Sequence, residues 1–268
     1  MKPIARFPED TARNLQGIFF DIDDTFTLAG RIPAASFSAL WELSAAGLFC
    51  VPITGRPAGW CDHIARMWPV TGVVGENGAL SFSYDRAEKR LKKRFFLPPD
   101  QAQKTRDLLM AAAADVLRAV PGAALASDQP YRLFDVAVDF TEDVKPLTGD
   151  EVNMICDIFA SHGLTYKVSS IHVNAWFGDY DKLTMTRIFS REVLGIDLDE
   201  NRDRFVFFGD SPNDEPMFGF FPHSVGVANI RDFAGRMKSL PAYVTENAGG
   251  VGFAEGARII MGKRAARR

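Results

Sequence analysis

The chain has 268 residues, of which 47% are hydrophobic and 24% are charged, and its formal net charge is −3. This is the composition of an ordinary globular protein, long enough for one large domain or for a core domain with a smaller one. Because the net charge is small and negative, general attraction to nucleic acid or acidic membranes is not expected, and an anionic ligand would need a local site.

Membrane and secreted proteins are also disfavoured. No apolar run approaches the about 18 residues that a membrane helix needs, and polar residues interrupt the N-terminus where a secretory signal would be apolar. A cytoplasmic location is therefore expected, and no protein partner is indicated. Three cysteines, Cys50, Cys61 and Cys156, are too few and too scattered for a disulfide framework, and we expect Cys50 and Cys156 to be small core residues.

The first part of the chain alternates short apolar runs with helical segments. Strands and helices are expected in turn at 15–20, 34–46, 48–53, 59–67 and 72–74. Each strand ends in a polar cluster. This rhythm predicts an α/β fold with a doubly wound, Rossmann-like parallel sheet, in which ligands bind at the carboxyl ends of strands.

The middle of the chain has a different pattern. An extended basic stretch, in which we expect Arg90–Arg94 to form a solvated strand face, is followed by alternating helices and strands. These are expected at about 100–120, 133–140, 149–162, 166–169 and 171–176. We expect residues 84–170 to form an inserted α+β cap domain, and residues 1–83 together with 171–268 to form the core.

The α/β rhythm resumes in the last third of the chain. Helices are expected at 182–193, near 232–238 and from 252, and strands at 204–208, 223–228 and 242–245. The six terminal residues, 263–268, are expected to be a solvated basic tail.

Two carboxylates follow the first strand. Asp21 and Asp23 are one residue apart at the strand end, so the period of two places both side chains on one side. Carboxylates that close repel each other unless a cation or a shared proton relieves them, which suits a nucleophile paired with a general acid/base. The alternative is an acidic strand–helix turn with Asp24 as the helix cap.

A second acidic cluster follows the strand at 204–208. Asp210 and Asp214, with Asn213 between them, offer the hard oxygen ligands that suit Mg²⁺. The same stretch also reads as a turn. However, an ordinary turn is a weak explanation when an acidic cluster follows a buried strand at two separate places in the chain.

Thr54 and Lys182 add donors for a phosphoryl group. Thr54 ends the second strand, and its hydroxyl and neighbouring backbone N–H offer one contact. Lys182 begins a helix, where a positive charge interacts unfavourably with the macrodipole and so does not stabilise the helix. A solvated lysine is the alternative.

Together these segments resemble the motifs of the haloacid dehalogenase-like (HAD) superfamily. The residues that carry the resemblance are Phe20-Asp21-Ile22-Asp23-Asp24-Thr25, Ile53-Thr54-Gly55-Arg56, Lys182 and Gly209-Asp210-Ser211-Pro212-Asn213-Asp214. The inserted unit is similar to the C2-type cap of the Cof-like (IIB) subgroup, which includes sugar phosphatases and phosphomannomutases, and Asn77-Gly78 also matches that subgroup. The sequence departs from it at Asp24, where glycine is usual, and at Phe26, where leucine is usual.

The resemblance implies a role for each motif. Asp21 would attack phosphorus, Asp23 would act as general acid and then general base, and Thr54 and Lys182 would hold the phosphoryl oxygens. The implied cofactor is Mg²⁺, with ligands from the set Asp21, Asp23, Asp210, Asn213 and Asp214. Dehalogenating members lack the second aspartate, so Asp23 argues against dehalogenation.

The substrate side is expected to involve both domains. His172, Asn174 and Trp176 alternate along one strand and could line a pocket from the cap side, while Gly55, Arg56 and Asn77 are candidates on the core side. The expected function is a Mg²⁺-dependent phosphatase acting on a small phosphorylated metabolite, a sugar phosphate in particular. A sugar phosphomutase and a non-catalytic binding protein are the alternatives.

Overall fold

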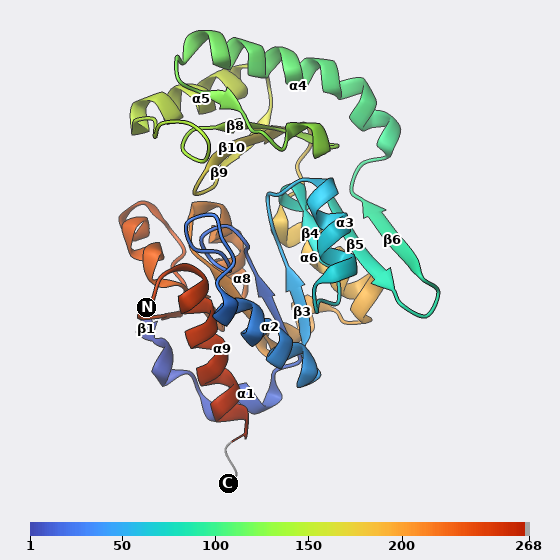
Figure 1. The fold of residues 1–268 in the computed structure, drawn as a ribbon, viewed down its shortest axis with the longest axis vertical. Helices are drawn as coiled ribbons and strands as arrows, with labels where there is room; N and C mark the ends of the chain where they lie inside the picture. The colour runs from blue at the N-terminus through green and yellow to red at the C-terminus, as the bar shows by residue number, and fades with distance from the viewer. Residues whose placement is uncertain (266–268) are drawn as a thin grey trace.

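A six-stranded parallel sheet forms the centre of the core, in the lower part of Figure 1. The computed structural model describes residues 1–265, apart from the side chain of residue 102. In sheet order the strands are β1 (Lys2–Pro3), β13 (Tyr243–Val244), β12 (Ser224–Gly226), β11 (Phe205–Gly209), β2 (Gly17–Phe20) and β3 (Phe49–Pro52). The chain leaves β2 toward β3 on one side, and β11 lies on its other side. The order of the sheet therefore reverses between β2 and β11, which is where such sheets bind ligands.

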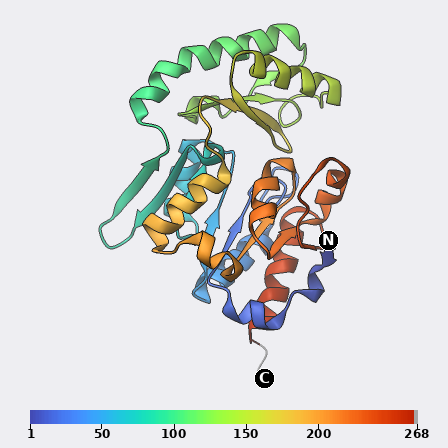
Figure 2. The same ribbon diagram turned by 180° about the vertical axis from the view of Figure 1, so that it is seen from behind.

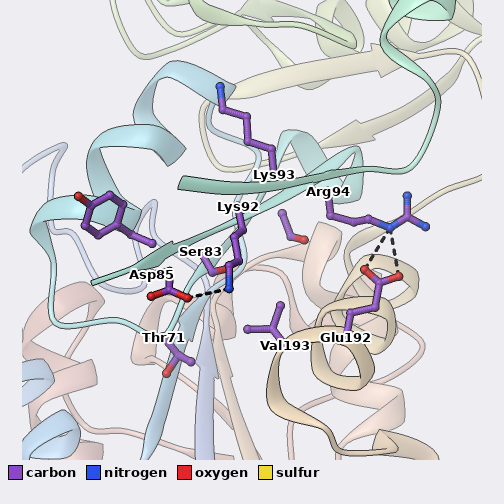
Figure 3. Close-up of a pocket in the computed structure, with 10 residues that line it drawn as sticks. Thr71, Ser83, Asp85, Lys92, Lys93, Arg94, Glu192 and Val193 are labelled. Carbon is purple, nitrogen blue, oxygen red and sulfur yellow. Dashed lines mark hydrogen bonds and ion pairs between the residues drawn. The ribbon is translucent and has the colours of Figure 1, made fainter. Parts of the chain in front are cut away.

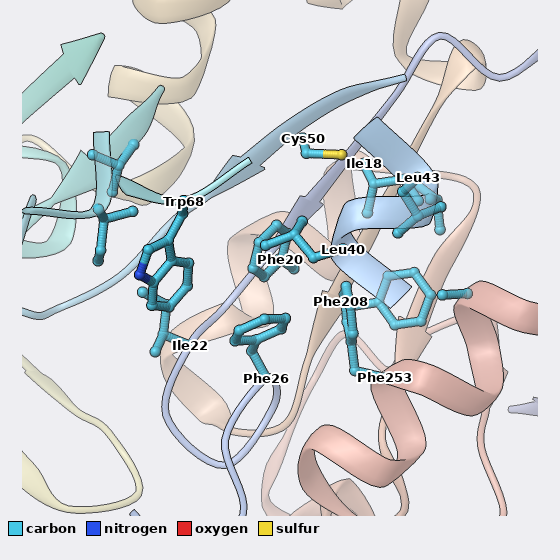
Figure 4. Close-up of a cluster of buried hydrophobic side chains, with 14 of the residues drawn as sticks. Ile18, Phe20, Ile22, Phe26, Leu40, Leu43, Cys50, Trp68, Phe208 and Phe253 are labelled. Atoms are coloured by element: carbon cyan, nitrogen blue, oxygen red, sulfur yellow. The ribbon is translucent and has the colours of Figure 1, made fainter. Parts of the chain in front are cut away.

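Side chains of the central strands alternate between two apolar clusters. Ile18 and Phe20 of β2 pack into one, shown in Figure 4, whereas Phe19 packs into the other. The first cluster is covered by α1 (Glu9–Asn14), α2 (Ala34–Ala45) and α9 (Gly249–Ala265). The second is covered by α6 (Lys182–Phe189), α7 (Leu198–Asn201) and α8 (Glu215–Phe220), on the side that Figure 2 shows. Helices on both faces confirm the doubly wound α/β fold.

A second, antiparallel sheet extends the core at its β3 edge. An isolated parallel bridge joins Ile53 to Val74 of β4 (Val73–Gly75). Strand β4 then pairs with β5 (Leu80–Asp85), and β5 pairs with β6 (Arg90–Phe95). Helix α3 (Ala58–Met67) packs against β5.

The cap is a four-stranded antiparallel sheet with two helices on its outer face (Figure 1). In sheet order the strands are β7 (Ala124–Leu125), β8 (Asp135–Asp139), β10 (His172–Trp176) and β9 (Thr165–Val168), and the helices are α4 (Pro99–Ala119) and α5 (Gly149–Ser161). A capping box between Thr148 and Glu151 begins α5. The cap has an apolar cluster of its own, which includes Cys156.

Strand pairing suggests cap boundaries other than the expected ones. Strand β6 forms a hairpin with β5 next to the core, although its basic sequence suggested the start of the cap. Strand β10 is hydrogen-bonded between β8 and β9, inside the cap sheet. We therefore propose that the cap runs from about residue 97 to about residue 178.

Hydrogen bonds between side chains and backbone groups fasten the cap to the core at two places. The carboxylate of Glu76 accepts hydrogen bonds from Ala58 N in the core and from Leu133 N and Phe134 N in the cap, at 2.7–2.9 Å. In the other direction, Arg132 of the cap donates to the carbonyl oxygen of Gly55 at 2.9 Å. The cap is thus held by more than its two connecting segments.

Most other expectations agree within a few residues. The helix expected at 182–193 is α6 followed by a π-helical turn, η4 (Ser190–Leu194), and the one near 232–238 is two 3-10 turns. These are η7 (Ala228–Asp232) and η8 (Ala234–Arg236); the others are η1 (Ile4–Arg6), η2 (Glu76–Gly78), η3 (Gln129–Tyr131), η5 (Arg202–Arg204) and η6 (Pro212–Asp214).

The two cysteines expected in the core, Cys50 and Cys156, are buried and unpaired as predicted. Of the basic tail, 263–265 continue α9, and 266–268 lie outside the described residues. Among the helices of residues 1–265, none combines the length and the apolar character needed to cross a membrane.

Candidate active site

The candidate site lies at the carboxyl ends of β2 and β11, where the sheet order reverses. Asp21 comes directly after β2, and its backbone N–H continues the sheet by donating to Phe208 O at 2.9 Å. Asp210 comes directly after β11, and Thr54 lies just beyond β3. The fold therefore brings three of the predicted positions to one edge of the sheet.

At this edge, Asp21, Lys182, Asp210 and Asp214 form what we call the nucleophile cluster, after the role that the sequence analysis expects of Asp21. Lys182 Nζ donates to Asp21 Oδ1 at 2.6 Å and to Asp214 Oδ1 at 2.7 Å. Ligand oxygens of the three aspartates lie within 4.8 Å of one another. All four side chains are buried. Residues that are up to 193 positions apart in sequence thus meet in one small volume.

Backbone groups hold Asp214 in place. Its Oδ2 accepts from the backbone N–H of Asp210 at 3.1 Å, while Ser211 and Asp214 form a capping box at η6. Gly209 makes this approach feasible, because a Cβ there would lie 2.5 Å from Asp214 Oδ2. Asp214 is therefore a fixed anchor for Lys182 rather than a mobile carboxylate.

Lys182 is positioned by the start of α6. Asp181 caps this helix by accepting from Thr184 N at 2.7 Å. The turn Asn77-Gly78 packs directly against Asp181, the N-cap residue of α6, since a Cβ on Gly78 would lie 2.0 Å from Asp181 O. Gly78 also has a φ of +107°, a conformation that favours glycine. This close approach aims the lysine at Asp21.

Asp210 is held by Thr25, which belongs to the first motif but had no role assigned, and by Asn229, which the sequence analysis did not identify. Thr25 Oγ1 donates to Asp210 Oδ1 and Asn229 Nδ2 donates to Asp210 Oδ2, both at 3.1 Å. The Asn229 amide also donates to the carbonyl oxygen of Asp24 at 3.1 Å. Asp24 itself has a φ of +53°, which explains why glycine suits this position and why aspartate is tolerated there.

The electrostatics of the nucleophile cluster leave room for a cation. Three ionised aspartates against one lysine would leave a net charge of −2. Burial raises the pKa of Asp21 to about 8, and Asp214 adds to the rise although Lys182 opposes it. Burial and the neighbouring Asp214 also raise the pKa of Asp210 well above its usual range. A buried, acidic set of hard oxygen donors fits Mg²⁺.

A second set of charged groups, which we call the Arg56 cluster, lies beside the first. Arg56 Nε donates to Asp23 at 3.0 Å, and Nη1 donates to Asp128 Oδ2 at 3.3 Å and to Glu142 Oε2 at 3.2 Å. The cluster joins two core residues, Arg56 and Asp23, to two cap residues, Asp128 and Glu142. The cap carboxylates were not anticipated, because nothing local in the sequence marks them.

Pairing shifts the pKa values of this second cluster in the stabilising direction. Burial acts against the ionisation of Arg56 and of Glu142. For Arg56, the nearby carboxylates of Asp23 and Glu142 outweigh burial and raise its pKa. In the same way, hydrogen bonds from His172 and Arg56 lower the pKa of Glu142 to about 2. Glu142 therefore remains a carboxylate throughout the neutral range.

The remaining predicted residues border these clusters. Thr54 is buried, and its Oγ1 accepts from Arg56 N at 3.0 Å. Asn77 donates its backbone N–H to Thr54 O at 3.1 Å. Asn213 Oδ1 accepts from Ser211 Oγ at 2.8 Å.

From the cap, His172 Nε2 lies 2.9 Å from Glu142 Oε2, and Asn174 donates to Asp135 at 2.8 Å. Trp176, on the same strand, stacks on Tyr180 in the core. His172 and Asn174 nevertheless reach the site. With Asp21, Asp23, Gly55 and Asn213 they line a small cavity of about 10 Å³ between cap and core.

A separate hollow of about 440 Å³ lies away from this edge of the sheet (Figure 3). Its basic wall comes from β6, where Lys92 pairs with Asp85 at 2.7 Å and Arg94 pairs with Glu192 at 3.2 Å. These ion pairs are exposed, in line with the solvated strand face expected for Arg90–Arg94.

The fold has close counterparts among solved structures. The C-terminal domain of trehalose-6-phosphate phosphatase from C. albicans matches with a TM-score of 0.70 at 12% sequence identity, over 98% of this chain and 99% of that one. A Thermoplasma acidophilum protein matches with a TM-score of 0.69 at 18% identity, over 92% and 98%. The chain thus has the fold of the HAD-like hydrolases, as its motifs predicted.

A further solved structure of similar fold is a sugar phosphatase. A sugar phosphatase of HAD subclass IIB matches with a TM-score of 0.60 at 16% identity, over 92% of this chain and 99% of that one. This chain therefore shares its fold with a structure of that subclass. No protein-family model matches the sequence, and none of the curated proteins does.

Proposed function

We propose that this protein is a Mg²⁺-dependent phosphatase that hydrolyses a small phosphorylated metabolite through an aspartyl-phosphate on Asp21. The observation that carries the proposal is the buried contact of 2.6 Å between Lys182 Nζ and Asp21 Oδ1 at the switch point of the sheet. The lysine fixes one carboxylate oxygen and with it the direction of the other. A fixed carboxylate beside a cation is suited to attack an anionic phosphate ester.

The chemistry divides into two steps. In the first, a carboxylate oxygen of Asp21 bonds to phosphorus, the ester P–O bond breaks, and Asp23 gives its proton to the departing oxygen. In the second, Asp23 takes a proton from water, the hydroxide oxygen bonds to phosphorus, and the bond to Asp21 breaks. Inorganic phosphate leaves and both aspartates return to their starting states.

The chain's own donors would stabilise the transferring group. Lys182 and Thr54 would face the phosphoryl oxygens, and Arg56 would keep Asp23 in place through the contacts at 2.8 and 3.0 Å. Mg²⁺, when held by Asp21, the Asp23 carbonyl and Asp210, with Asn213 and Asp214 in support, would supply positive charge against the phosphate and the carboxylates.

A small sugar phosphate is the proposed substrate class. His172 and Asn174 line the cavity from the cap, and Arg56 and Gly55 line it from the core. Such polar walls suit a hydroxylated leaving group. A sugar phosphomutase would use the same nucleophile but return the phosphoryl group to the sugar.

Phosphate release tests the proposal. The purified protein is incubated with Mg²⁺ and a panel of phosphorylated metabolites, and inorganic phosphate and the remaining sugar phosphates are quantified. We expect one phosphate per sugar released, without a bisphosphate activator. Isomerised sugar phosphate without phosphate release would support the mutase, and no reaction with any ester would refute both.

A further inference from the structure

A pocket of about 350 Å³ opens beside Asp23, between the loop after β2 and the cap. It shares Asp23, Arg56, Ser170 and Ile171 with the small cavity that contains Asp21. The pocket therefore adjoins the cavity of Asp21 on the side of Asp23, the expected general acid. In the proposed reaction this is the side on which the leaving group must lie.

The walls of this pocket are acidic. Asp23, Asp24 and Glu142 supply three carboxylates, and Arg56 supplies the one positive charge among its lining residues. With all four ionised the walls carry a net charge of −2.

Arg56 has no N–H group to spare for an anion. Its Nε and Nη2 donate to Asp23, Nη2 also donates to Glu142, and Nη1 donates to Asp128 and Glu142. A second anionic group on the substrate would have to displace one of these carboxylates. In a partly buried site such like-charge contact is costly.

Glu142 is built into its position. Asp139, at the end of β8, accepts from the backbone N–H groups of Thr141, Glu142 and Asp143 at 2.7–2.8 Å. This fixes the loop that carries Glu142. The Glu142 side chain stays 25% exposed, so it faces the pocket while its other contacts hold it.

We propose that Glu142 is a specificity-determining residue, which makes this pocket select phosphate esters with an uncharged, hydroxylated leaving group and reject those with a second anionic group. A carboxylate accepts hydrogen bonds from hydroxyls and repels anions. The inference rests on the proposed phosphatase activity and extends it to the chemical class of the leaving group.

Matched substrates test the proposal. Aryl phosphates with a para hydroxymethyl, carboxylate or aminomethyl group differ mainly in charge, and glucose 6-phosphate and 6-phosphogluconate repeat the comparison with polyols. We expect wild-type kcat/KM to be about tenfold lower for each carboxylate ester than for its neutral partner. The aminomethyl ester should react at least as well as the hydroxymethyl ester.

Variants assign the effect to Glu142. Glu142→Gln should bring the neutral-to-anionic ratio close to one, Glu142→Asp should keep most of the discrimination, and Asp143→Asn on the same loop should change nothing. Thermal melting checks that each variant is folded, and the wild-type ratios stand even where one is not. Equal or faster wild-type turnover of the carboxylate esters, or an unchanged ratio in folded Glu142→Gln, would overturn the proposal. Failure to hydrolyse any ester would instead overturn the phosphatase function.

Discussion

The nucleophile cluster and the Arg56 cluster are both buried sets of carboxylates around one cation, yet their charges are balanced differently. In the first, burial raises the pKa of Asp21 to about 8 despite Lys182. In the second, Arg56 and His172 lower the pKa of Glu142 to about 2. At Asp21 the cost of burial outweighs the attraction of Lys182, whereas at Glu142 the contacts with His172 and Arg56 outweigh burial. We therefore expect the first cluster to gain more from a further cation than the second.

The two clusters also differ in what they connect. All four members of the nucleophile cluster belong to the core, where strand ends, backbone N–H groups and the start of α6 position them. The Arg56 cluster spans core and cap, and the five N–H donors of the planar guanidinium reach three carboxylates at once. We infer that the first is adapted to chemistry and the second to holding the cap and orienting Asp23.

The largest expected effect is on the nucleophile. Asp21→Asn should lower kcat by about 10⁴-fold or more, since an amide cannot form the phosphoenzyme. Steady-state kinetics with the best substrate measure this, with Asp62→Asn on the exposed face of α3 as control. Circular dichroism should show an intact fold, and near-normal turnover would place the nucleophile elsewhere.

Removal of divalent cations tests whether the nucleophile cluster requires a further positive charge. Exhaustive chelation should lower the rate by about 10³-fold, because several kcal/mol of charge stabilisation would be lost, and Mg²⁺ should restore it. Mg²⁺ should also raise the melting temperature by relieving repulsion among Asp21, Asp210 and Asp214. Asp210→Asn should abolish that thermal shift. Full activity after chelation contradicts the metal assignment.

Breaking the Arg56 cluster should affect stability. Arg56→Met leaves Asp23, Asp128 and Glu142 without their shared cation, which should lower the free energy of unfolding by about 3–5 kcal/mol. Urea titration measures the loss, and limited proteolysis should detect a looser cap. Arg66→Met, which removes a half-exposed ion pair with Asp62, should cost at most about 1 kcal/mol. Equal losses in the two variants would mean that Arg56 is not a fastening residue.

The pH dependence of stability tests the other contact between cap and core. Burial raises the pKa of Glu76 from 4.5 to about 7, so the native state binds more protons than the unfolded state between these values. The free energy of unfolding should therefore fall by up to about 3 kcal/mol as pH rises from 4.5 to 7, and this contribution should not change further above pH 7. Glu76→Gln should flatten that slope. Glu255→Gln, which alters a carboxylate bound to backbone N–H groups nearer the surface, should leave it unchanged.

The smallest effect is expected at the hollow of Figure 3. The side chains of Arg94 and Glu192 are each 47% exposed, so Arg94→Ala should change the free energy of unfolding by less than about 1 kcal/mol. It should leave kcat/KM unchanged. A large loss of activity would mean that this surface is coupled to the site through β6 or η4.

The sequence predicted the elements whose signals are local. Apolar runs that end in Asp21 and Asp210 located β2 and β11, and the alternation of elements predicted the doubly wound sheet. The likeness to HAD motifs predicted the fold that the solved structures share. Lys182 stood out because a cation at the start of a helix does not stabilise that helix. In the structure it donates to Asp21.

Other features depend on contacts between distant parts of the chain. Glu142 lies 86 positions from Arg56 and Asp128 lies 72 positions from it, and nothing near either carboxylate in sequence signals that partner. The pairing of β6 with β5, and of β10 with β8 and β9, likewise follows from long-range packing that short patterns do not encode.

By itself, then, the sequence determined the order of strands and helices and the acidic residues at the strand ends, because backbone periodicity and turn chemistry act over a few residues. Only the tertiary structure decided which charges meet across the cap–core boundary. The physical reason is desolvation: taking Arg56 and Glu142 out of water costs free energy that their mutual ion pair offsets.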